Sequence, residues 1–362
     1  MSKKKLALIF GGRSGEHEIS IISARSVSTA VSAQKYDLLP IYITRDGKWL
    51  SESVSAKILK TDFEKLIKKP DELADMHKKI EQWAEKSRFK FDFSKVDVAF
   101  PVMHGTFGED GTVQGFLEML QIPFVGCGVL ASSLTMDKAM SKIHFERAGL
   151  LLAPYVVATR NEWLSHPKKI ISEAEKKLGY PMFVKPANMG SSVGISKAKS
   201  RKDLNEAMAL ACNYDRKIVI EAGVNARELE ISVLGNENPM TSVVGEIVPC
   251  NEFYDYDAKY IKGTSELFIP ARISTKVAKE ISKMAIIAFQ ATNCEGMARV
   301  DFFMDKTSGK LYINEINTIP GFTSISMYPK MFAAAGISYA ELVDRLLTLA
   351  FERFADIKKN KV

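Results

Sequence analysis

A βαβ pattern at the start of the chain constrains the fold more than any other feature. Residues 6–10 (LALIF) form a continuous apolar run, and the turn GGRSGEHE separates it from a helical pattern over residues 19–31. Further strands are predicted over residues 38–43 and 97–103. Because strands that are apolar on both faces pair in parallel under a covering of helices, this region predicts a parallel α/β domain, which we place over residues 1–134.

The rest of the chain predicts two α+β units. Two short strands flank the sequence ANMGSSVG and are followed by a helix and another strand, so we place a central domain over residues 135–223. Four more strands, a long helix and a final helix indicate a C-terminal domain over residues 224–362. Within it, residues 249–270 show neither helical nor strand periodicity. A connection of this length without secondary structure indicates a lid or a binding loop.

Composition limits the class of protein and its partners. With 362 residues, 46% of them hydrophobic and 26% charged, the chain is typical of a soluble globular protein with more than one core. Its apolar runs are too short for a signal peptide or a membrane span, so we expect a cytoplasmic protein without a membrane partner. The net charge is +7, but the basic residues are interleaved with acidic ones, so we expect no nucleic-acid partner. Four scattered cysteines without a CxxC pair argue against zinc sites and disulfide bonds.

The sequence ANMGSSVG has the composition of a phosphate-binding turn. Its glycines and serines would let backbone N–H groups and hydroxyls approach phosphate oxygens closely. The chain contains no GxxxxGK[ST] motif, so a glycine-rich hairpin lying over a nucleotide is the nearer geometry, and a plain hairpin turn is the alternative. Lys185 lies in the apolar run that enters this turn. Because a buried ammonium group needs a partner, we expect a nucleotide phosphate beside it.

A second polar group lies at the end of two predicted strands. Arg299 and Asp301 are two residues apart on one strand, and Glu315 and Asn317 are two residues apart on the next, so each pair shares a face. Carboxylate and amide oxygens are typical ligands of Mg²⁺, and an arginine beside them would neutralise charge on a transferred group. The alternatives are an edge strand with one polar face and a structural ion pair between Arg299 and Asp301.

Acidic residues near two predicted helix starts can be explained by the helix dipole alone or by a role in a functional site. Glu16 precedes the first helix, where the helix dipole alone favours a carboxylate, and the same holds for Glu109 and Asp110. His17 and His104 have no serine or cysteine nucleophile at a recognisable spacing, so a hydrolase triad is not supported.

Seven motifs together resemble those of one enzyme family. GGRSGEHEIS, HGTFGEDGTVQG, MDKAMSK, FVKPANMGSSVG, EFYDYDAKY, ARVDF and NEINTIPGFTSISMYP occur in the order seen in D-alanine-D-alanine ligases, a branch of the ATP-grasp superfamily. The resemblance implies an ATP-grasp fold with an N-terminal parallel-sheet domain and ATP between the central and C-terminal domains. It also implies Mg²⁺ or Mn²⁺ as cofactor, ATP and two D-alanine molecules as substrates, and a D-alanyl phosphate intermediate in peptidoglycan precursor synthesis. We expect a homodimer.

The resemblance assigns roles to residues that match these motifs. The nucleotide ligands would be Lys138, Lys185, Lys259, Ser191 and Ser192 at the phosphates, Glu221, Ala222 and Val224 at the adenine, and Glu228 at the ribose. The magnesium ligands would be Asp301, Glu315 and Asn317. The substrate ligands would be Glu16 at the first ammonium, His104 nearby, Lys259, and Ser326 and Met327 at the second carboxylate. The catalytic groups would be Arg299 and the backbone N–H of Gly321 at the oxyanion, with a hydrogen-bonded triad of Glu16, Ser191 and Tyr260.

Three alternatives stay open at the level of sequence. The nearest is a ligase of the same fold that joins D-alanine to D-lactate or D-serine, and the next is another ATP-grasp amide ligase. Tyr260 in the DAKY motif favours an amine nucleophile over the hydroxyl of lactate. A non-catalytic nucleotide-binding regulator would keep the glycine-rich turn but would not require Glu16, Arg299 or the lid.

Overall fold

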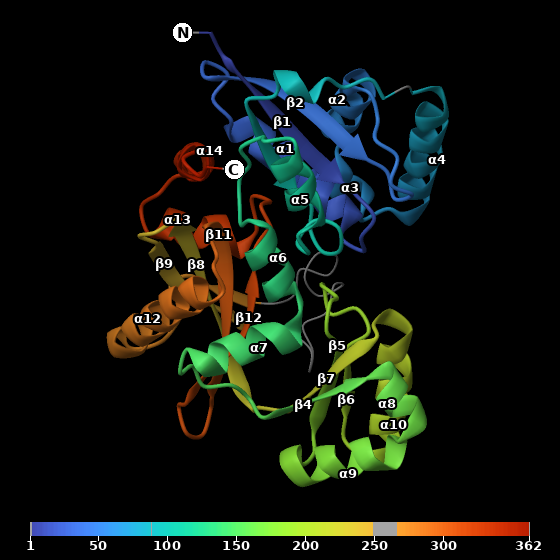
Figure 1. The fold of residues 1–362 in the computed structure, drawn as a ribbon, viewed down its shortest axis with the longest axis vertical. Helices are drawn as coiled ribbons and strands as arrows, with labels where there is room; N and C mark the ends of the chain where they lie inside the picture. The colour runs from blue at the N-terminus through green and yellow to red at the C-terminus, as the bar shows by residue number, and fades with distance from the viewer. Residues whose placement is uncertain (1, 88, 249–265, 362) are drawn as a thin grey trace.

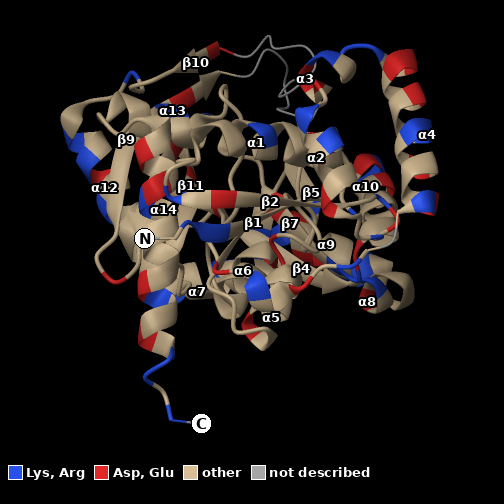
Figure 2. Ribbon diagram, turned by 90° about the horizontal axis from the view of Figure 1, so that it is seen from above, with Lys and Arg blue, Asp and Glu red and all other residues tan. Residues whose placement is uncertain are grey.

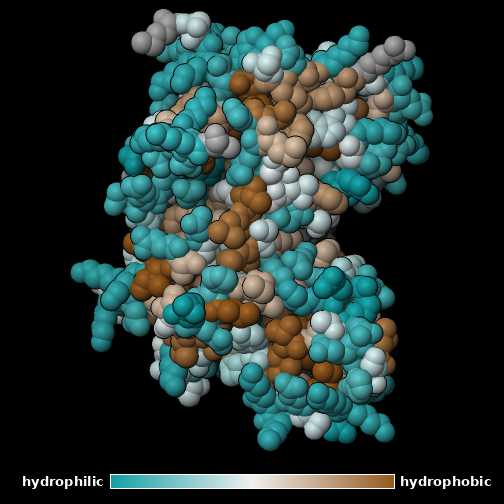
Figure 3. Space-filling model, viewed as in Figure 1, coloured by the Kyte–Doolittle hydropathy of each residue, from teal (hydrophilic) through white to brown (hydrophobic). Residues whose placement is uncertain are grey.

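Three sheets follow one another along the chain in a computed structural model that describes residues 2–87, 89–248 and 266–361. Figure 1 shows the N-terminal sheet at one end of the molecule, and the C-terminal and central sheets side by side at the other. In the space-filling view hydrophilic side chains cover most of this face, and apolar ones gather between the domains and over the central domain (Figure 3). Basic and acidic residues are interspersed along α4 (Pro70–Lys86) and α14 (Tyr339–Ile357) (Figure 2).

The N-terminal sheet is parallel, with strand order β2-β1-β3, which confirms the prediction made from the apolar run. Its strands are β1 (Lys4–Gly11), β2 (Tyr36–Ile43) and β3 (Val98–Val102). Its two main helices are α1 (His17–Ala30) and α5 (Thr112–Met119). Leu8 and Phe10 pack into the core that contains α1, while Ala7 and Ile9 pack into the core that contains α5. Both faces of the sheet are therefore covered, as its continuous apolar sequence requires.

Residues 52–95 form an insertion at the edge of this domain. It contains α2 (Glu52–Lys60), α3 (Phe63–Leu66), α4 (Pro70–Lys86) and the short 3-10 helix η1 (Phe93–Lys95). Only Ile80 of α4 is buried, so α4 is a surface helix.

The central sheet is antiparallel, with order β4-β7-β5-β6. Its strands are β4 (Tyr155–Thr159), β5 (Met182–Pro186), β6 (Ser196–Ala198) and β7 (Lys217–Ala222). Its helices are α8 (Arg160–Ser165), α9 (Pro167–Leu178) and α10 (Arg201–Tyr214). Met182, Val184 and Ile220 pack with α9 and α10 on one face. The alternation of side chains places Lys185 and Glu221 on the other face.

The C-terminal sheet is antiparallel, with order β10-β9-β8-β11-β12. Its strands are β8 (Ala226–Gly235), β9 (Met240–Val248), β10 (Glu266–Phe268), β11 (Gly296–Asp305) and β12 (Leu311–Asn317). The helices α12 (Thr275–Ala291) and α13 (Met327–Ala334) pack against this sheet. The expectation that residues 249–270 lack secondary structure is wrong at one end, because β10 pairs with β9. Residues 249–265 lie outside the described part of the chain.

Three helices connect the sheets. They are α6 (Val129–Met136), α7 (Lys138–Arg147) and α14 (Tyr339–Ile357). The helices α6 and α7 meet at Asp137, whose carboxylate caps α7 by accepting the N–H groups of Ala139 and Met140. The division of the chain by sequence puts α7 in the central domain, yet Phe145 of α7 packs into the core of the C-terminal sheet. Among the described helices none combines the length and apolar character needed to cross a membrane.

Candidate active site

A pocket of about 100 Å³ lies where the three sheets meet. It is lined from the N-terminal domain, from the glycine-rich loop (residues 187–194) and from the end of β12. The predicted site residues that line it are Glu16, His104, Lys138, Ser191, Ser192, Arg299, Glu315, Asn317 and Gly321. The fold thus gathers nine of the predicted side chains or backbone groups from segments far apart in sequence.

The glycine-rich loop is held in an uncommon backbone conformation. Ser191 and Ser192 have φ of 50° and 59°, the left-handed region that residues with a side chain seldom adopt. Asp215 accepts both the backbone N–H and the side-chain Nδ2 of Asn188, at 2.7 and 2.9 Å, and so anchors the start of the loop. Lys138 Nζ donates to the Met189 carbonyl at 2.7 Å. The Ser191 Oγ is buried and makes no hydrogen bond within the described residues, so the loop presents a polar atom without a protein partner there.

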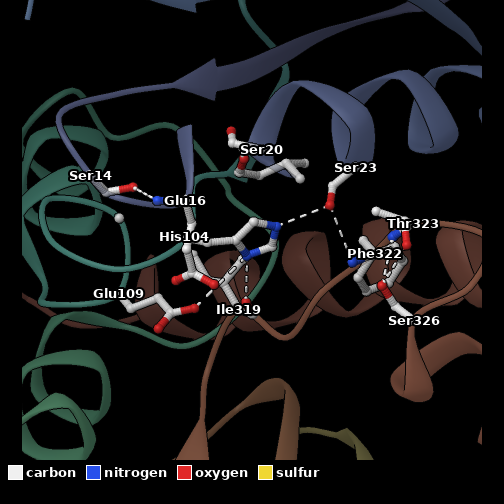
Figure 4. Close-up of polar contacts among 12 residues, drawn as sticks. Ser14, Glu16, Ser20, Ser23, His104, Glu109, Ile319, Phe322, Thr323 and Ser326 are labelled. Atoms are coloured by element: carbon white, nitrogen blue, oxygen red, sulfur yellow. Dashed lines mark hydrogen bonds and ion pairs between the residues drawn. The ribbon is translucent and has the colours of Figure 1, made fainter. Parts of the chain in front are cut away.

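The Glu16 carboxylate lies between two glycines. Its Oε2 is 3.3 Å from the position that a Cβ would take at Gly190 and 3.4 Å from the corresponding position at Gly105. Its backbone N–H donates to Ser14 Oγ at 3.2 Å, just before α1 begins (Figure 4). A Cβ at Gly190 would be in tight contact with this carboxylate and one at Gly105 would touch it, so the two glycines line the space in which the Glu16 carboxylate lies.

His104 joins the N-terminal domain to the turn after β12 (Figure 4). Its Nδ1 lies 2.9 Å from the Ile319 carbonyl and therefore donates to it. The Ser23 hydroxyl, 3.0 Å from Nε2, donates to the ring and accepts the Phe322 backbone N–H at 3.3 Å. Burial lowers the pKa of His104, which agrees with the neutral ring that this network requires. Both ring nitrogens are occupied by protein groups, so the histidine positions the turn that carries Gly321.

Glu109 is a site residue that the sequence analysis attributed to a helix start. Its Oε1 lies 4.0 Å from His104 Nδ1, and it lines the pocket. Burial, and then the charge of Glu16, raise the pKa of Glu109 well above its ordinary value, so the carboxyl group is held towards its neutral form. The neighbouring Asp110 accepts the N–H groups of Phe107 and Thr112 and has the structural role expected at a helix start. Glu109 could have been identified as a candidate site residue from its place in the HGTFGEDGT motif.

The polar residues of β11 and β12 lie on paired strands. Asp301 is directly opposite Glu315, and Arg299 is opposite Asn317. Arg299 donates two hydrogen bonds of 2.7 Å to Asp301, and its Nε lies 3.1 Å from Glu230, so the structural ion pair considered as an alternative is present. Asn317 Nδ2 donates to Asp301 Oδ2 at 3.1 Å, which leaves its carbonyl oxygen as an acceptor.

This oxygen-donor set also fits a hard divalent cation. Two carboxylates and an amide oxygen are the ligand types that Mg²⁺ and Mn²⁺ prefer, and Glu315 and Asn317 line the pocket. Within the described residues, no group of three or more His, Cys, Asp or Glu side chains is arranged as a metal site by protein ligands alone. A magnesium site here would therefore be completed by substrate oxygens and water, as Mg²⁺ sites in nucleotide enzymes commonly are.

Lys185 has a carboxylate partner within the protein, and its contact with a nucleotide phosphate stays a prediction. Its Nζ donates to Glu221 Oε2 at 2.8 Å, and Lys142 Nζ lies 3.1 Å from Glu221 Oε1. Burial alone would raise the pKa of Glu221, but the two ammonium groups outweigh it and lower the pKa to about 2. We call Lys142, Lys185 and Glu221 the Glu221 cluster. Lys142 lies one helical turn after Lys138 and is the last residue of the MDKAMSK motif, and these were the sequence signals for it.

The other predicted residues that the structure describes do not line this pocket. Ala222 ends β7, and Val224 follows two residues later. Glu228 lines a separate open hollow with Glu246. Ser326 Oγ accepts the Thr323 N–H at 3.1 Å immediately before α13, and the buried Met327 side chain packs against Ile247 and Met331. Lys259 and Tyr260 lie outside the described residues.

The three sheets and the pocket beneath a glycine-rich hairpin define an ATP-grasp ligase. Family models described as D-ala D-ala ligase N-terminus and D-ala D-ala ligase C-terminus match residues 5–127 and 144–348. The chain belongs to the D-alanine-D-alanine ligase family.

Relatives and solved structures agree over nearly the whole chain. The D-alanine--D-alanine ligase of Chloroherpeton thalassium is 58% identical over 100% of both chains, and that of Acetivibrio thermocellus is 48% identical over 98% of this chain and 97% of the relative. The structure of the Coxiella burnetii D-alanine-D-alanine ligase has a TM-score of 0.81 and 32% identity, covering 99% of this chain and 98% of that one. The VanG D-Ala:D-Ser ligase from Enterococcus faecalis also has a TM-score of 0.81, with 35% identity over 96% of this chain and 100% of that one.

Proposed function

We propose that this chain uses ATP to join two D-alanine molecules into D-alanyl-D-alanine, with release of ADP and phosphate, for peptidoglycan precursor synthesis. The observation that carries the proposal is the single pocket that gathers Glu16, the glycine-rich loop, Arg299, Glu315 and Gly321. A regulator that only binds nucleotide would have no use for both the Glu16 carboxylate and the Arg299 guanidinium in the lining of this pocket. Curated relatives named as D-alanine--D-alanine ligases support the same reaction.

ATP would bind between the open face of the central sheet and the β11-β12 pair. Lys138 and Lys185, with Lys259, would neutralise the phosphates, and the turn at Ser191 and Ser192 would close over them. The Ser191 hydroxyl, which has no hydrogen-bond partner among the described residues, and the left-handed turn support this assignment, because both would leave hydrogen-bonding groups directed at a ligand. The base and ribose would meet the strand ends on this side of the pocket, at Glu221, Ala222, Val224 and Glu228.

A divalent cation, Mg²⁺ or Mn²⁺, would be held by Asp301, Glu315 and Asn317. When bound, it would supply positive charge to the phosphate oxygens during phosphoryl transfer. Arg299 is already fixed beside this group by its two hydrogen bonds to Asp301. Its guanidinium would therefore need no rearrangement to meet the charge that develops on the substrate.

The first D-alanine would bind with its ammonium group at Glu16. Its carboxylate attacks the γ-phosphorus of ATP, ADP leaves, and D-alanyl phosphate forms. The second D-alanine would place its carboxylate at the start of α13, where the Ser326 hydroxyl and the backbone N–H of Met327 are supported by the positive end of the helix dipole.

The second step joins the two amino acids. The neutral amine of the second D-alanine attacks the acyl carbon, and the tetrahedral oxyanion accepts hydrogen bonds from Arg299 and the Gly321 N–H. Collapse of this intermediate releases phosphate and leaves the new amide bond. The amine must lose a proton before it attacks, and the proposed triad of Glu16, Ser191 and Tyr260 would orient it in that form. Closure of the lid would keep out the water that hydrolyses an acyl phosphate.

We also propose a cytoplasmic homodimer whose partners are small molecules, with neither nucleic acid nor membrane as a partner. The proposed cytoplasmic location is supported by the need of the reaction for a supply of ATP. Sedimentation of the purified protein over a range of concentrations tests the dimer.

The test of the function is a competition among acceptors, because a solved relative is named as a D-Ala:D-Ser ligase. Purified protein is incubated with ATP, Mg²⁺ and D-alanine, together with D-serine and D-lactate at the same concentration, near neutral pH. We expect D-Ala-D-Ala as the main product, little ester, and a shift towards the ester in Tyr260→Phe. Comparable ester or D-serine product from the unaltered protein would replace the proposed acceptor, and phosphate release without any dipeptide would refute the ligase.

A further inference from the structure

Lys142 is a buried charged group that the proposed mechanism leaves without a role. Its side chain is 2% exposed, and its ammonium lies 3.1 Å from Glu221 Oε1. The Tyr155 ring lies 5.4 Å from Nζ on another side. Burial lowers the pKa of Lys142, while Glu221 opposes that shift and Lys185 adds to it. A lysine buried to this degree is costly unless its charge is used by a partner.

We propose that Lys142 is a positioning residue that keeps Glu221 ionised and directed at the purine edge, and that it thereby sets the preference of the nucleotide site for adenine over guanine. The inference rests on the proposed function, in which Glu221 meets the nucleotide base. It adds a determinant of base selectivity that acts through Glu221 and does not itself touch the nucleotide.

The chemistry of the two bases gives the preference its direction. Adenine carries an amino group at position 6, which donates hydrogen bonds, while guanine carries a carbonyl oxygen there, which accepts them. An ionised carboxylate only accepts, so it binds the amino group and repels the carbonyl oxygen. A protonated carboxyl group can donate to the carbonyl oxygen and would lose this discrimination. The charge state of Glu221 is therefore the selective feature.

Lys142 is the cation that stays with Glu221 when nucleotide binds. Lys185 is also bonded to Glu221 here, but as a proposed phosphate ligand it would turn towards ATP. Lys142 lies on α7 beneath the central sheet, where its other charged neighbours are Glu315 and Lys185. If Lys185 binds the phosphates and Lys142 is replaced, neither lysine offsets the free-energy cost of burying the charged Glu221 carboxylate.

The test compares ATP with GTP as substrates of Lys142→Met, Lys142→Arg and Lys177→Met between pH 6 and pH 9. Lys177 is the matched control, because its Nζ lies 5.6 Å from the same Tyr155 ring but it is exposed and is not paired with Glu221. In Lys142→Met we expect the ratio of kcat/KM for ATP over GTP to fall roughly 10-fold to 100-fold at pH 6, because a change of this size corresponds to the loss of one hydrogen bond to a charged group. Lys142→Arg should stay within about threefold of the unaltered protein, because a cation is retained.

The pH profile separates a positioning role from a merely structural one. In the unaltered protein the ratio should be flat between pH 6 and pH 9, because Glu221 is ionised throughout. In Lys142→Met the ratio should recover as pH rises, because Glu221 ionises again. The KM for D-alanine should change by less than about twofold, since the amino-acid sites do not touch this cluster.

A double variant keeps the test decisive if Lys142→Met does not fold. Lys142→Met with Glu221→Gln leaves no unpaired carboxylate, and glutamine offers both a donor and an acceptor to the base. We expect this variant to fold and to have a low ATP over GTP ratio at every pH. An unchanged ratio in either variant, or the same fall in Lys177→Met, would overturn the inference. Failure of the unaltered protein to make dipeptide would instead refute the proposed function.

Discussion

Gly105 and Gly190 leave the space in which the Glu16 carboxylate lies, and they bring it to the wall of the pocket. Because Glu16 lines the pocket, a ligand bound there would meet this carboxylate. A charged hydrogen bond to a substrate ammonium is worth roughly 1.5–3 kcal/mol, so its loss is measurable as a change in affinity.

Replacing Glu16 by Gln should weaken binding of the first D-alanine by roughly 10-fold to 100-fold, because the amide keeps the shape but not the charge. The KM for ATP should change by less than about threefold, since the nucleotide does not touch Glu16 in the proposed arrangement. Initial rates against D-alanine and against ATP measure the two effects. Equal loss for ATP, with D-alanine binding unaltered, would contradict the assignment.

His17, the next residue, should make the fold sensitive to mild acid. Burial lowers its pKa to about 4, and its ring bonds the Gly12 carbonyl and the Tyr42 hydroxyl at 2.7 Å each. Because the folded value lies below the ordinary 6.5, its stabilising effect is full above pH 6.5 and is lost as pH falls towards 4. This one group should cost about 3 kcal/mol of unfolding free energy over that window.

Urea unfolding of the unaltered protein and of His17→Gln at pH 6.5 and pH 4 measures this effect. Glutamine keeps a donor and an acceptor but does not titrate, so its stability should fall less steeply with acid. Other buried groups such as His104 titrate alike in both proteins and cancel in the comparison. Parallel loss in the two proteins would rule out His17 as the source.

Site residues were predictable where a motif marks a position exposed to a ligand. Lys138, Ser191 and Asn317 were identified in this way, and they line one pocket. Lys142 was not identified, because a lysine in a helix is usually exposed and only the fold shows that Glu221 on a distant strand meets it. The role assigned to each residue stays a prediction until it is tested.

At the scale of elements, α1 and the turn after β12 are held together by one serine. Ser23 accepts the Phe322 N–H and donates to His104, so it fixes the segment that contains Gly321. Only the tertiary structure brings these groups together, since Ser23 and Phe322 are 299 residues apart.

Replacing Ser23 by Ala should lower kcat by about 10-fold with a smaller change in either KM, because the Gly321 N–H would be less well positioned for the oxyanion. The loss of two buried hydrogen bonds should also cost about 2 kcal/mol of stability. Ser26→Ala is the matched control, since the Ser26 hydroxyl bonds only the Ile22 carbonyl of its own helix. Equal kcat in the two variants would show that Ser23 does not position the turn.

The strands with a clear apolar core were predictable, and the short peripheral ones were not. Residues 6–10 predicted β1 because both faces of that strand are buried. The strands β4 and β10 were not predicted, because they lie at sheet edges where few positions are buried and the pattern is weak.

At the scale of the whole molecule, the C-terminal helix joins two domains. Arg353 of α14 donates to the carbonyls of Gly126 and Phe124, the latter at 3.0 Å, and its guanidinium lies 4.3 Å from the Phe124 ring. Leu342 and Leu346 of the same helix pack into the core of the N-terminal domain. These contacts predict that the two domains unfold together.

Replacing Arg353 by Met should lower the free energy of unfolding by about 3 kcal/mol, because two buried carbonyls lose their donor. The control is Arg345→Met on the same helix, where an exposed pair with Glu341 should contribute less than about 1 kcal/mol. Thermal and urea unfolding measure both. A loss in Arg353→Met no larger than in the control would show that the arginine does not join the domains.

The place of α14 in the chain also bears on how the protein folds during translation. Residues 339–357 leave the ribosome after every other described helix and strand, yet they complete the core that begins with Leu6 and Leu8 of β1. While the chain is being synthesised, the apolar face of the N-terminal domain that α14 will cover is open to water. A ribosome-bound chain lacking residues 339–357 should therefore be bound by chaperones and cut by proteases at its N-terminal domain, and protection should come only once residues 339–357 have left the ribosome.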